Sequence, residues 1–171
     1  RNTLAGVVRA HVAAEQVGLK LIVGACLDLT DAPSLLCLPT DRAAYGRLSR
    51  LLSFGQKRAD KGQCLLALDD VAEAAHGQIF IALPPDGWRW DTVGDNEGLQ
   101  TALRRFKVKL GGAALYLAAS HTYRGDDRAH IAALDALGRR CGVPLVATGD
   151  VLYHVAHRRP PPGRARHGVA G

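Results

Sequence analysis

The chain has 171 residues, 47% of them hydrophobic and 22% charged, which is the composition of a globular domain with a sizeable core. No apolar run is long enough for a transmembrane helix, and the polar opening at Arg1 does not resemble a signal peptide. We therefore expect a cytoplasmic protein with no membrane partner. The net charge of +6 includes four arginines in residues 158–171, so residues 1–157 carry only +2 and charge alone predicts no nucleic-acid binding.

The first part of the chain predicts a helix, two strands and a second helix. The predicted ranges are 3–17 for the helix, 19–29 and 34–38 for the strands, and Thr40 or Asp41 to Gly55 for the second helix. In the first helix Leu4, Val7, Val8 and His11 share one face. We interpret His11 as a packed core histidine on this face.

The rest of the chain alternates apolar and amphipathic segments. The predicted ranges are a short apolar segment at 64–68, helices at 71–75, 96–109 and 128–140, and strands at 78–83, 113–118 and 143–147. This alternation predicts an α/β fold with a mainly parallel sheet. Residues 1–157 form one predicted domain, and the Pro/Gly/Arg-rich residues 158–171 are predicted to be a disordered tail.

The cysteines and tryptophans are predicted to be packing residues. The four cysteines form no CxxC pair, and three of them, Cys26, Cys37 and Cys64, lie in apolar runs, which predicts reduced, buried thiols. Trp88 and Trp90 flank Arg89 in a loop. We expect them to pack onto the fold, with a contact surface as the alternative.

A polar cluster follows the last predicted strand. After residues 143–147 come Thr148-Gly149, and then Asp150, Tyr153 and His154 within five residues. Ligands in α/β proteins bind outside the carboxyl ends of the strands. This segment is therefore the first place where chemistry is expected.

Four blocks together resemble the PHP (polymerase and histidinol phosphatase) domain of bacterial C-family DNA polymerases, of the error-prone alpha-subunit type. The blocks are residues 1–11 (RNTLAGVVRAH), 18–29 (GLKLIVGACLDL), 44–64 (AYGRLSRLLSFGQKRADKGQC) and 144–160 (PLVATGDVLYHVAHRRP). The resemblance implies a partial, distorted (β/α)7 TIM-like barrel, truncated at both ends relative to its parent. It implies a parent that synthesises DNA across lesions, with its own polymerase domains, DNA, translesion accessory proteins and a sliding clamp as partners.

The resemblance also implies a weakened metal site. The family's Gly-X-Glu motif reads Gly24-Ala25-Cys26, its usual histidine falls on Ser34, and its Asp-X-His motif reads Asp150-Val151-Leu152. A degenerate scaffold module follows from these losses, so no cofactor is expected. The alternative is a metal-dependent phosphoesterase, an exonuclease or pyrophosphatase, with a divalent Zn, Mn or Mg ion at a residual site of His121 and Asp150. A nonfunctional truncated product is a third reading.

Three further interpretations concern rim and tail residues. Asp28 follows a predicted strand and is interpreted as a rim or turn carboxylate. The alternative for His121 is a rim histidine that makes ordinary hydrogen bonds, and the alternative for Asp150 is a carboxylate that accepts hydrogen bonds from loop amides near Tyr153. The basic cluster His157, Arg158 and Arg159 could contact DNA phosphates, with a solvated charge run as the alternative.

Overall fold

The computed structural model describes residues 1–121, 123 and 125–149. Its elements, in chain order, are α1 (Val7–Gln16), β1 (Ala25–Leu27), β2 (Leu35–Pro39), α2 (Arg42–Lys57), α3 (Leu68–Glu73), β3 (Gln78–Ala82), α4 (Val93–Lys109), β4 (Ala114–Ala119), α5 (Asp127–Cys141) and β5 (Leu145–Ala147). The predicted tail and the end of the predicted domain lie outside the described residues. No helix in the described ranges is both long and apolar enough to cross a membrane.

The five strands form one sheet whose spatial order is the chain order, β1-β2-β3-β4-β5. The pairs β1–β2 and β2–β3 are antiparallel, and the pairs β3–β4 and β4–β5 are parallel. The α/β class is confirmed, but the prediction of a mainly parallel sheet is wrong. Within the described residues the sheet is mixed and open, with β1 and β5 at its edges.

The short connection between β1 and β2 explains the first antiparallel pair. Only residues 28–34 join these strands, and a parallel crossover needs about a dozen residues or more. Between β2 and β3 the chain passes through both α2 and α3, a connection long enough for either strand direction. Pro39 at the end of β2 pairs with Gln78 at the start of β3, so these two helices connect neighbouring strand ends.

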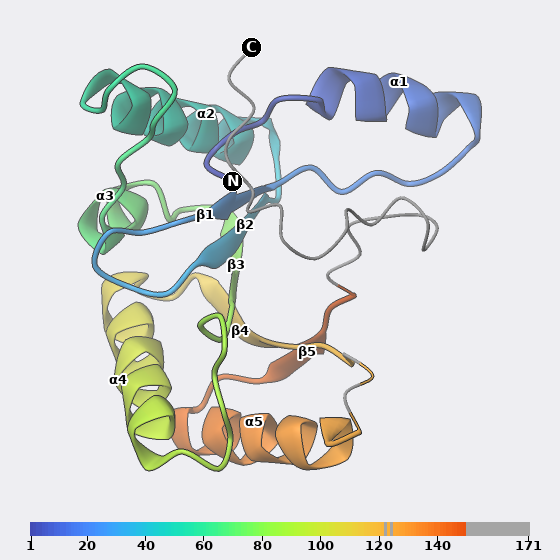
Figure 1. Ribbon diagram of the computed structural model, residues 1–171. Coiled ribbons are helices and arrows are strands. Elements are labelled where there is room, and N and C mark those ends of the chain that lie inside the picture. Colours follow the sequence, from blue (N-terminus) through green and yellow to red (C-terminus); the bar gives the residue numbers. More distant parts are fainter. Residues whose placement is uncertain (122, 124, 150–171) are drawn as a thin grey trace.

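The core lies between one face of the sheet and the helices α2 to α5. In Figure 1 α2 lies above the sheet, α3 and α4 lie to its left, and α5 lies below it. Strand residues such as Leu35, Phe80 and Leu117 are fully buried there together with helix residues. Four residues of α4 that share one face at helical spacing are buried: Leu99, Ala102, Leu103 and Phe106. Burial of large apolar side chains at about 1.5–3 kcal/mol each holds this layer to the sheet.

The opposite face of the sheet is also apolar. Its side chains alternate with the core row along each strand, and they are Cys26, Leu36, Leu38, Ile79, Ile81, Tyr116, Ala118 and Val146. None of them belongs to the main core cluster. Sheets with apolar residues on both faces are typical of α/β proteins in which both faces are covered.

The first predicted strand and the first helix differ most from expectation. Of the range 19–29, only Ala25–Leu27 forms a strand, because β2 offers pairing partners to those residues alone. Helix α1 extends away from the rest of the fold in Figure 1 and buries only Ala14. The prediction of a packed core histidine is wrong, because the His11 side chain is 61% exposed and pairs with Glu15 at 3.4 Å.

Local sequence signals set the ends of several helices. Asp41 caps α2 by accepting a hydrogen bond of 2.7 Å from Ala44 N. Gly142 follows α5 with φ of +63°, the left-handed conformation that commonly ends a helix. Gly111 and Gly112 follow α4 and its cap Leu110, and both have the positive φ that favours glycine beyond the end of a helix.

Candidate functional site at one edge of the sheet

Several predicted site residues gather at one edge of the sheet. This edge holds the carboxyl ends of β1, β3, β4 and β5 and, because β2 is antiparallel, the amino end of β2. Asp28, Ser34, His121 and Thr148 follow or precede these ends directly. A backbone bond from Leu83 N to Ser34 O, and another from Thr148 N to Ala119 O, tie the loops together here.

Arg1 occupies the centre of the hydrogen-bond network at this edge. Its Nη1 donates to Oδ1 of Asp28 at 2.6 Å and to Oγ of Ser34 at 3.1 Å. Ser34 Oγ in turn donates to the same carboxylate oxygen at 2.6 Å. The hydrogen bond to Asp28 raises the pKa of the Arg1 guanidinium above its usual value. Asp28 is a rim carboxylate, as predicted, and a guanidinium neutralises its charge.

Asn2 joins β1 to the segment that follows α2. Its Nδ2 donates to the carbonyl oxygens of Asp28 and Cys64, and its Oδ1 accepts from Asp28 N at 2.8 Å. Its backbone N–H donates to Cys26 O at 2.8 Å. Asn2 adopts φ of +52°, a left-handed conformation that asparagine tolerates better than most residues. The hydrogen bonds of Asn2 therefore connect the end of β1 to the segment that follows α2.

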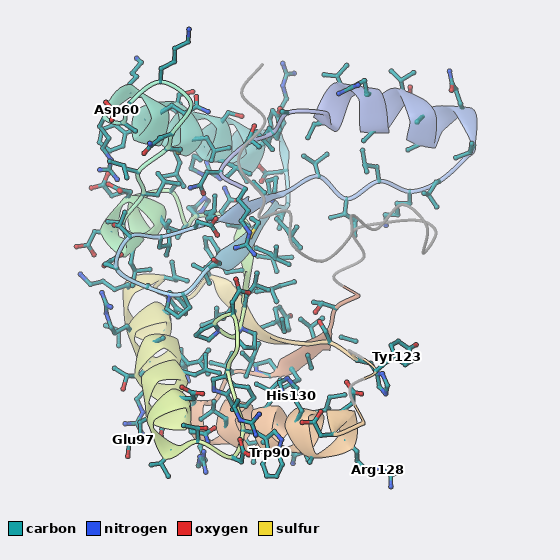
Figure 2. The ribbon with its side chains drawn as sticks, viewed as in Figure 1. Asp60, Trp90, Glu97, Tyr123, Arg128 and His130 are labelled. Atoms are coloured by element: carbon teal, nitrogen blue, oxygen red, sulfur yellow. The ribbon has the colours of Figure 1, made fainter. Side chains whose placement is uncertain are left out.

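A polar hollow of about 470 Å³ opens beside this network. Its lining is Arg1, Asn2, Thr3, Asp28, Gln56, Asp60, Lys61, Gly62, Gln63 and Cys64. Asp60, which Figure 2 labels, lies in the turn after α2. Acidic and basic side chains both line the hollow, so it favours neither an anion nor a cation.

Hydroxyl and imidazole groups occupy the β4–β5 part of the edge. Ser120 and Thr148 share a hydrogen bond of 2.7 Å between their hydroxyl oxygens. The His121 ring stands edge-on to Tyr123 with 4.5 Å between ring centres. Its Nδ1 lies 3.8 Å from a carboxylate oxygen of the buried Asp127 at the start of α5. At that distance the pair is an electrostatic contact rather than a hydrogen bond.

The described residues do not fit the metal cluster that the resemblance implies. Within residues 1–121, 123 and 125–149, no three His, Cys, Asp or Glu side chains come together as a metal-binding group. Asp28 already carries a cationic partner in Arg1. Cys26 lies on the sheet face opposite the core and is half-buried. Asp150, the other half of the predicted residual site, lies outside the described residues, as do His154, His157, Arg158 and Arg159.

The four cysteines form no disulfide bond, and their environments differ. Cys37 and Cys141 are buried, whereas Cys26 and Cys64 are partly exposed. Burial raises the pKa of the Cys37 thiol to about 12. Its Sγ lies 3.3 Å from Oε1 of Gln78, whose amide also donates to Ala44 O. The prediction of a buried thiol is thus confirmed for Cys37 and only partly met for Cys26 and Cys64.

The tryptophan loop packs onto the fold at Trp88. Its side chain is 7% exposed, its Nε1 donates to Asp95 O at 3.1 Å, and its ring meets His130 of α5 edge-on at 5.1 Å. Trp90 retains 38% exposure on the outer side of this loop, where Figure 2 labels it near His130. The packing prediction is confirmed for Trp88, and Trp90 is only partly covered.

Sequence reasoning missed three residues at the edge: Arg1, Asn2 and Asp127. Arg1 and Asn2 contact Asp28 across 27 and 26 positions, and no local pattern reports such contacts. Asp127 carries a weak signal, because a carboxylate in the first turn of a helix that follows a strand lies near the strand's carboxyl end.

Comparison with known proteins identifies relatives but leaves the domain type open. No protein-family model matches the chain. A segment of the error-prone DNA polymerase of Caulobacter vibrioides is 47% identical over 161 residues, and error-prone DNA polymerase 1 of Agrobacterium fabrum is 43% identical over 159. The error-prone DNA polymerase of Rhodopirellula baltica is 40% identical over 164. These matches cover 92–94% of this chain and 14% of each relative. The chain is thus homologous to a small segment of error-prone DNA polymerases.

Proposed function

We propose that the chain is a PHP-type scaffold module of an error-prone DNA polymerase that acts in translesion synthesis and DNA repair. The observation that carries this proposal is the match of nearly the whole chain to one segment of these polymerases, at 40–47% identity. The module supports the polymerase fold and takes no part in nucleotide transfer. Polymerase domains elsewhere in the parent chain carry that chemistry, and DNA, accessory proteins and a sliding clamp bind the parent.

The apolar sheet face supports a place within a larger PHP-type barrel. Leu36, Ile79, Ile81 and Tyr116 project from that face, which is the side opposite the helices. In a (β/α) barrel the helices surround the sheet and the apolar inner face is filled by layers of side chains. The five strands would then form one arc of a distorted (β/α)7 wall, and further strands of the parent would complete it.

The network of Arg1 favours the scaffold over a phosphoesterase. A phosphoesterase of this kind needs several carboxylates and histidines free to hold metal ions. At this edge Asp28 instead pairs with Arg1 and accepts from Ser34, while Cys26 and Ser34 stand at two expected ligand positions. The carboxylate therefore stabilises the edge of the sheet.

A segment replacement tests the scaffold role. The matched segment of the Caulobacter vibrioides polymerase is replaced by the corresponding residues of this chain, and primer extension is measured. We expect the chimera to retain extension. The same chimera carrying Phe80→Asp should lose it, because Phe80 is fully buried in the core. Loss of extension in a soluble, folded chimera without the Phe80 change would contradict the proposal.

Metal analysis tests the alternative function. The purified 171-residue chain is incubated with Zn, Mn or Mg and assayed for bound metal and for hydrolysis of a labelled oligonucleotide and of pyrophosphate. The scaffold proposal predicts neither stoichiometric metal nor hydrolysis. Hydrolysis that is lost in His121→Ala but kept in His11→Ala, an exposed histidine on α1, would establish the phosphoesterase instead.

A further inference from the structure

Helix α2 carries four cations and, within its own residues, no acid. The cations are Arg42, Arg47, Arg50 and Lys57. Some cations on α4 and α5 have ion pairs, namely Arg105 with Asp31, Lys109 with Asp69, and Arg139 with Asp135. Arg104, Arg128 and Arg140 on these helices have no ion pair among the described residues, but acidic residues are present on both helices. Arg47 donates to a backbone carbonyl, that of His76. Among the described residues, Arg42, Arg50 and Lys57 have neither an ion pair nor a hydrogen-bonded side-chain partner.

These three cations share the outer face of the helix. At 3.6 residues per turn they fall within a sector of about 80° and extend about 22 Å along the axis. The opposite side holds the buried residues Ala44, Leu48, Leu51, Leu52 and Gly55. All three cations are exposed. Between them lie Gly46, whose added Cβ would meet open space, and Ser53, whose hydroxyl bonds back to Ser49 O. The outer face is therefore cationic and free of bulky side chains.

Lys57 stands in the last turn of α2, where the helix dipole favours a cation, but helix stability does not account for Arg42 or Arg50. Arg42 stands in the first turn, where the helix dipole disfavours a cation. No glutamate or aspartate within α2 is available to pair with Arg50 or Lys57 at i,i+4 spacing. A local choice that weakens an element without a compensating contact is expected at functional positions.

We infer that the outer face of α2, formed by Arg42, Arg50 and Lys57, binds the phosphate backbone of duplex DNA. A span of about 22 Å corresponds to about six phosphate steps of one strand at 3.4 Å each. This contact goes beyond the proposed scaffold role, because the module would then bind DNA directly. It requires no metal and no reaction at the sheet edge.

The absence of a stacking platform on this face favours duplex over single-stranded DNA. Proteins that grip single strands interleave cations with aromatic rings that stack on bases. The nearest aromatic ring on α2, Phe54, lies beside this face rather than within it, and the Arg58 guanidinium lies 4.8 Å from its ring centre. Contacts to phosphates carry no sequence information, so we expect the binding to be independent of sequence.

Fluorescence anisotropy with the full 171-residue chain and two unrelated labelled duplexes tests the inference. The variant Arg42→Gln/Arg50→Gln/Lys57→Gln is compared with Arg9→Gln/Arg128→Gln/Arg140→Gln, which removes the same charge from α1 and α5. Residues 158–171, with their four arginines, are identical in both variants. We expect the α2 variant to bind both duplexes about tenfold more weakly or worse, and its salt slope to fall by about 2.7, since each phosphate contact contributes about 0.9.

The matched variant should keep nearly the parental affinity and slope. Equal losses in the two variants, or no loss in either, would overturn the inference, because binding would then depend on overall charge or on another surface. A loss seen only with single-stranded oligonucleotides would overturn the duplex assignment. Thermal unfolding of both variants confirms that the outward-facing glutamines leave the fold intact. The metal and chimera experiments do not depend on this outcome.

Discussion

Arg1 and Asp28 meet at 2.6 Å between Nη1 and Oδ1, at the edge of the sheet where the carboxyl ends of the strands converge. The side chains are 50% and 40% exposed, so solvent screens the pair. Exposed ion pairs contribute about 0.2–1 kcal/mol to stability. The main effect of Arg1 is to neutralise the charge of the Asp28 carboxylate. The stability of this part of the sheet edge depends more on the neighbouring Asn2 and its hydrogen bonds.

Replacement of Asn2 should therefore destabilise the fold more than replacement of Arg1. Asn2→Gly keeps the left-handed backbone available and removes three part-buried side-chain hydrogen bonds, which we expect to cost about 1–3 kcal/mol. Arg1→Gln should cost less than about 1 kcal/mol. Urea unfolding of both variants measures the difference. A larger loss from Arg1→Gln would show that the ion pair dominates this part of the sheet edge.

The Arg58–Asp70 pair should give stability that depends on acid pH. Burial opposes ionisation of Asp70, but hydrogen bonds from Arg58 and from Ala67 N outweigh it and lower the pKa of the carboxyl. A lowered folded-state pKa means that this contribution is present above the ordinary aspartate value of 3.8 and is lost as the pH falls below it.

Asp70→Asn should accordingly lose about 1–3 kcal/mol of stability at pH 7, and the difference from the parent should shrink as the pH falls below about 4. Chemical denaturation across this range measures it. Asp69→Asn is the matched control, because its salt bridge to Lys109 is exposed and contributes little. A pH-independent difference between Asp70→Asn and the parent would contradict the ion-pair explanation.

Gly138 of α5 should not tolerate a side chain. A Cβ there would lie 2.5 Å from the carbonyl oxygen of Val143, a backbone atom that cannot move aside locally. We expect Gly138→Ala to cost about 1–3 kcal/mol through overpacking. Gly98→Ala on α4 meets no atom within 4 Å and should stabilise the helix by about 0.5–1 kcal/mol. Opposite shifts in the melting temperature are the expected result, and equal shifts would refute the close approach.

Cys37 should resist alkylation in the folded protein. Its thiol is 1% exposed and its pKa is raised to about 12, so almost no thiolate forms at pH 8. Iodoacetamide should therefore label the partly exposed Cys26 and Cys64 before Cys37, which peptide mass spectrometry can follow. Full labelling of all four thiols in denaturant is the control. Early labelling of Cys37 in the native protein would show that β2 opens readily.

Hydrophobic periodicity predicted the helices whose apolar faces pack against the sheet. The helical spacing of Leu99, Leu103 and Phe106 indicates one apolar face of α4, and these residues are buried in the core against the sheet. The same spacing failed at His11, because it shows which residues of α1 share a face without showing whether another element covers that face. Strand direction was also predictable in part, since residues 28–34 are too short for a parallel crossover.

The edge site was predictable only through topology. Asp28 and His121 follow strands, and strand ends converge at a sheet edge, so their common location could be expected. The Arg1 contact to Asp28 could not, because it joins residues 27 positions apart without a local motif. The cationic face of α2 was readable from the sequence as a helix without acids, but its exposure required the structure.

The order of the strands has a consequence for how this fold assembles. Each strand pairs with the strand just before it in the chain, so every new strand finds its template already synthesised. Assembly can proceed from the amino end during translation, at a ribosomal pace of about 5–20 residues per second. Strand β3 joins the antiparallel half of the sheet to the parallel half. A disruptive substitution of its fully buried Phe80 therefore interrupts formation of the sheet at its middle strand, whereas a substitution in β5 affects only the last strand to be added.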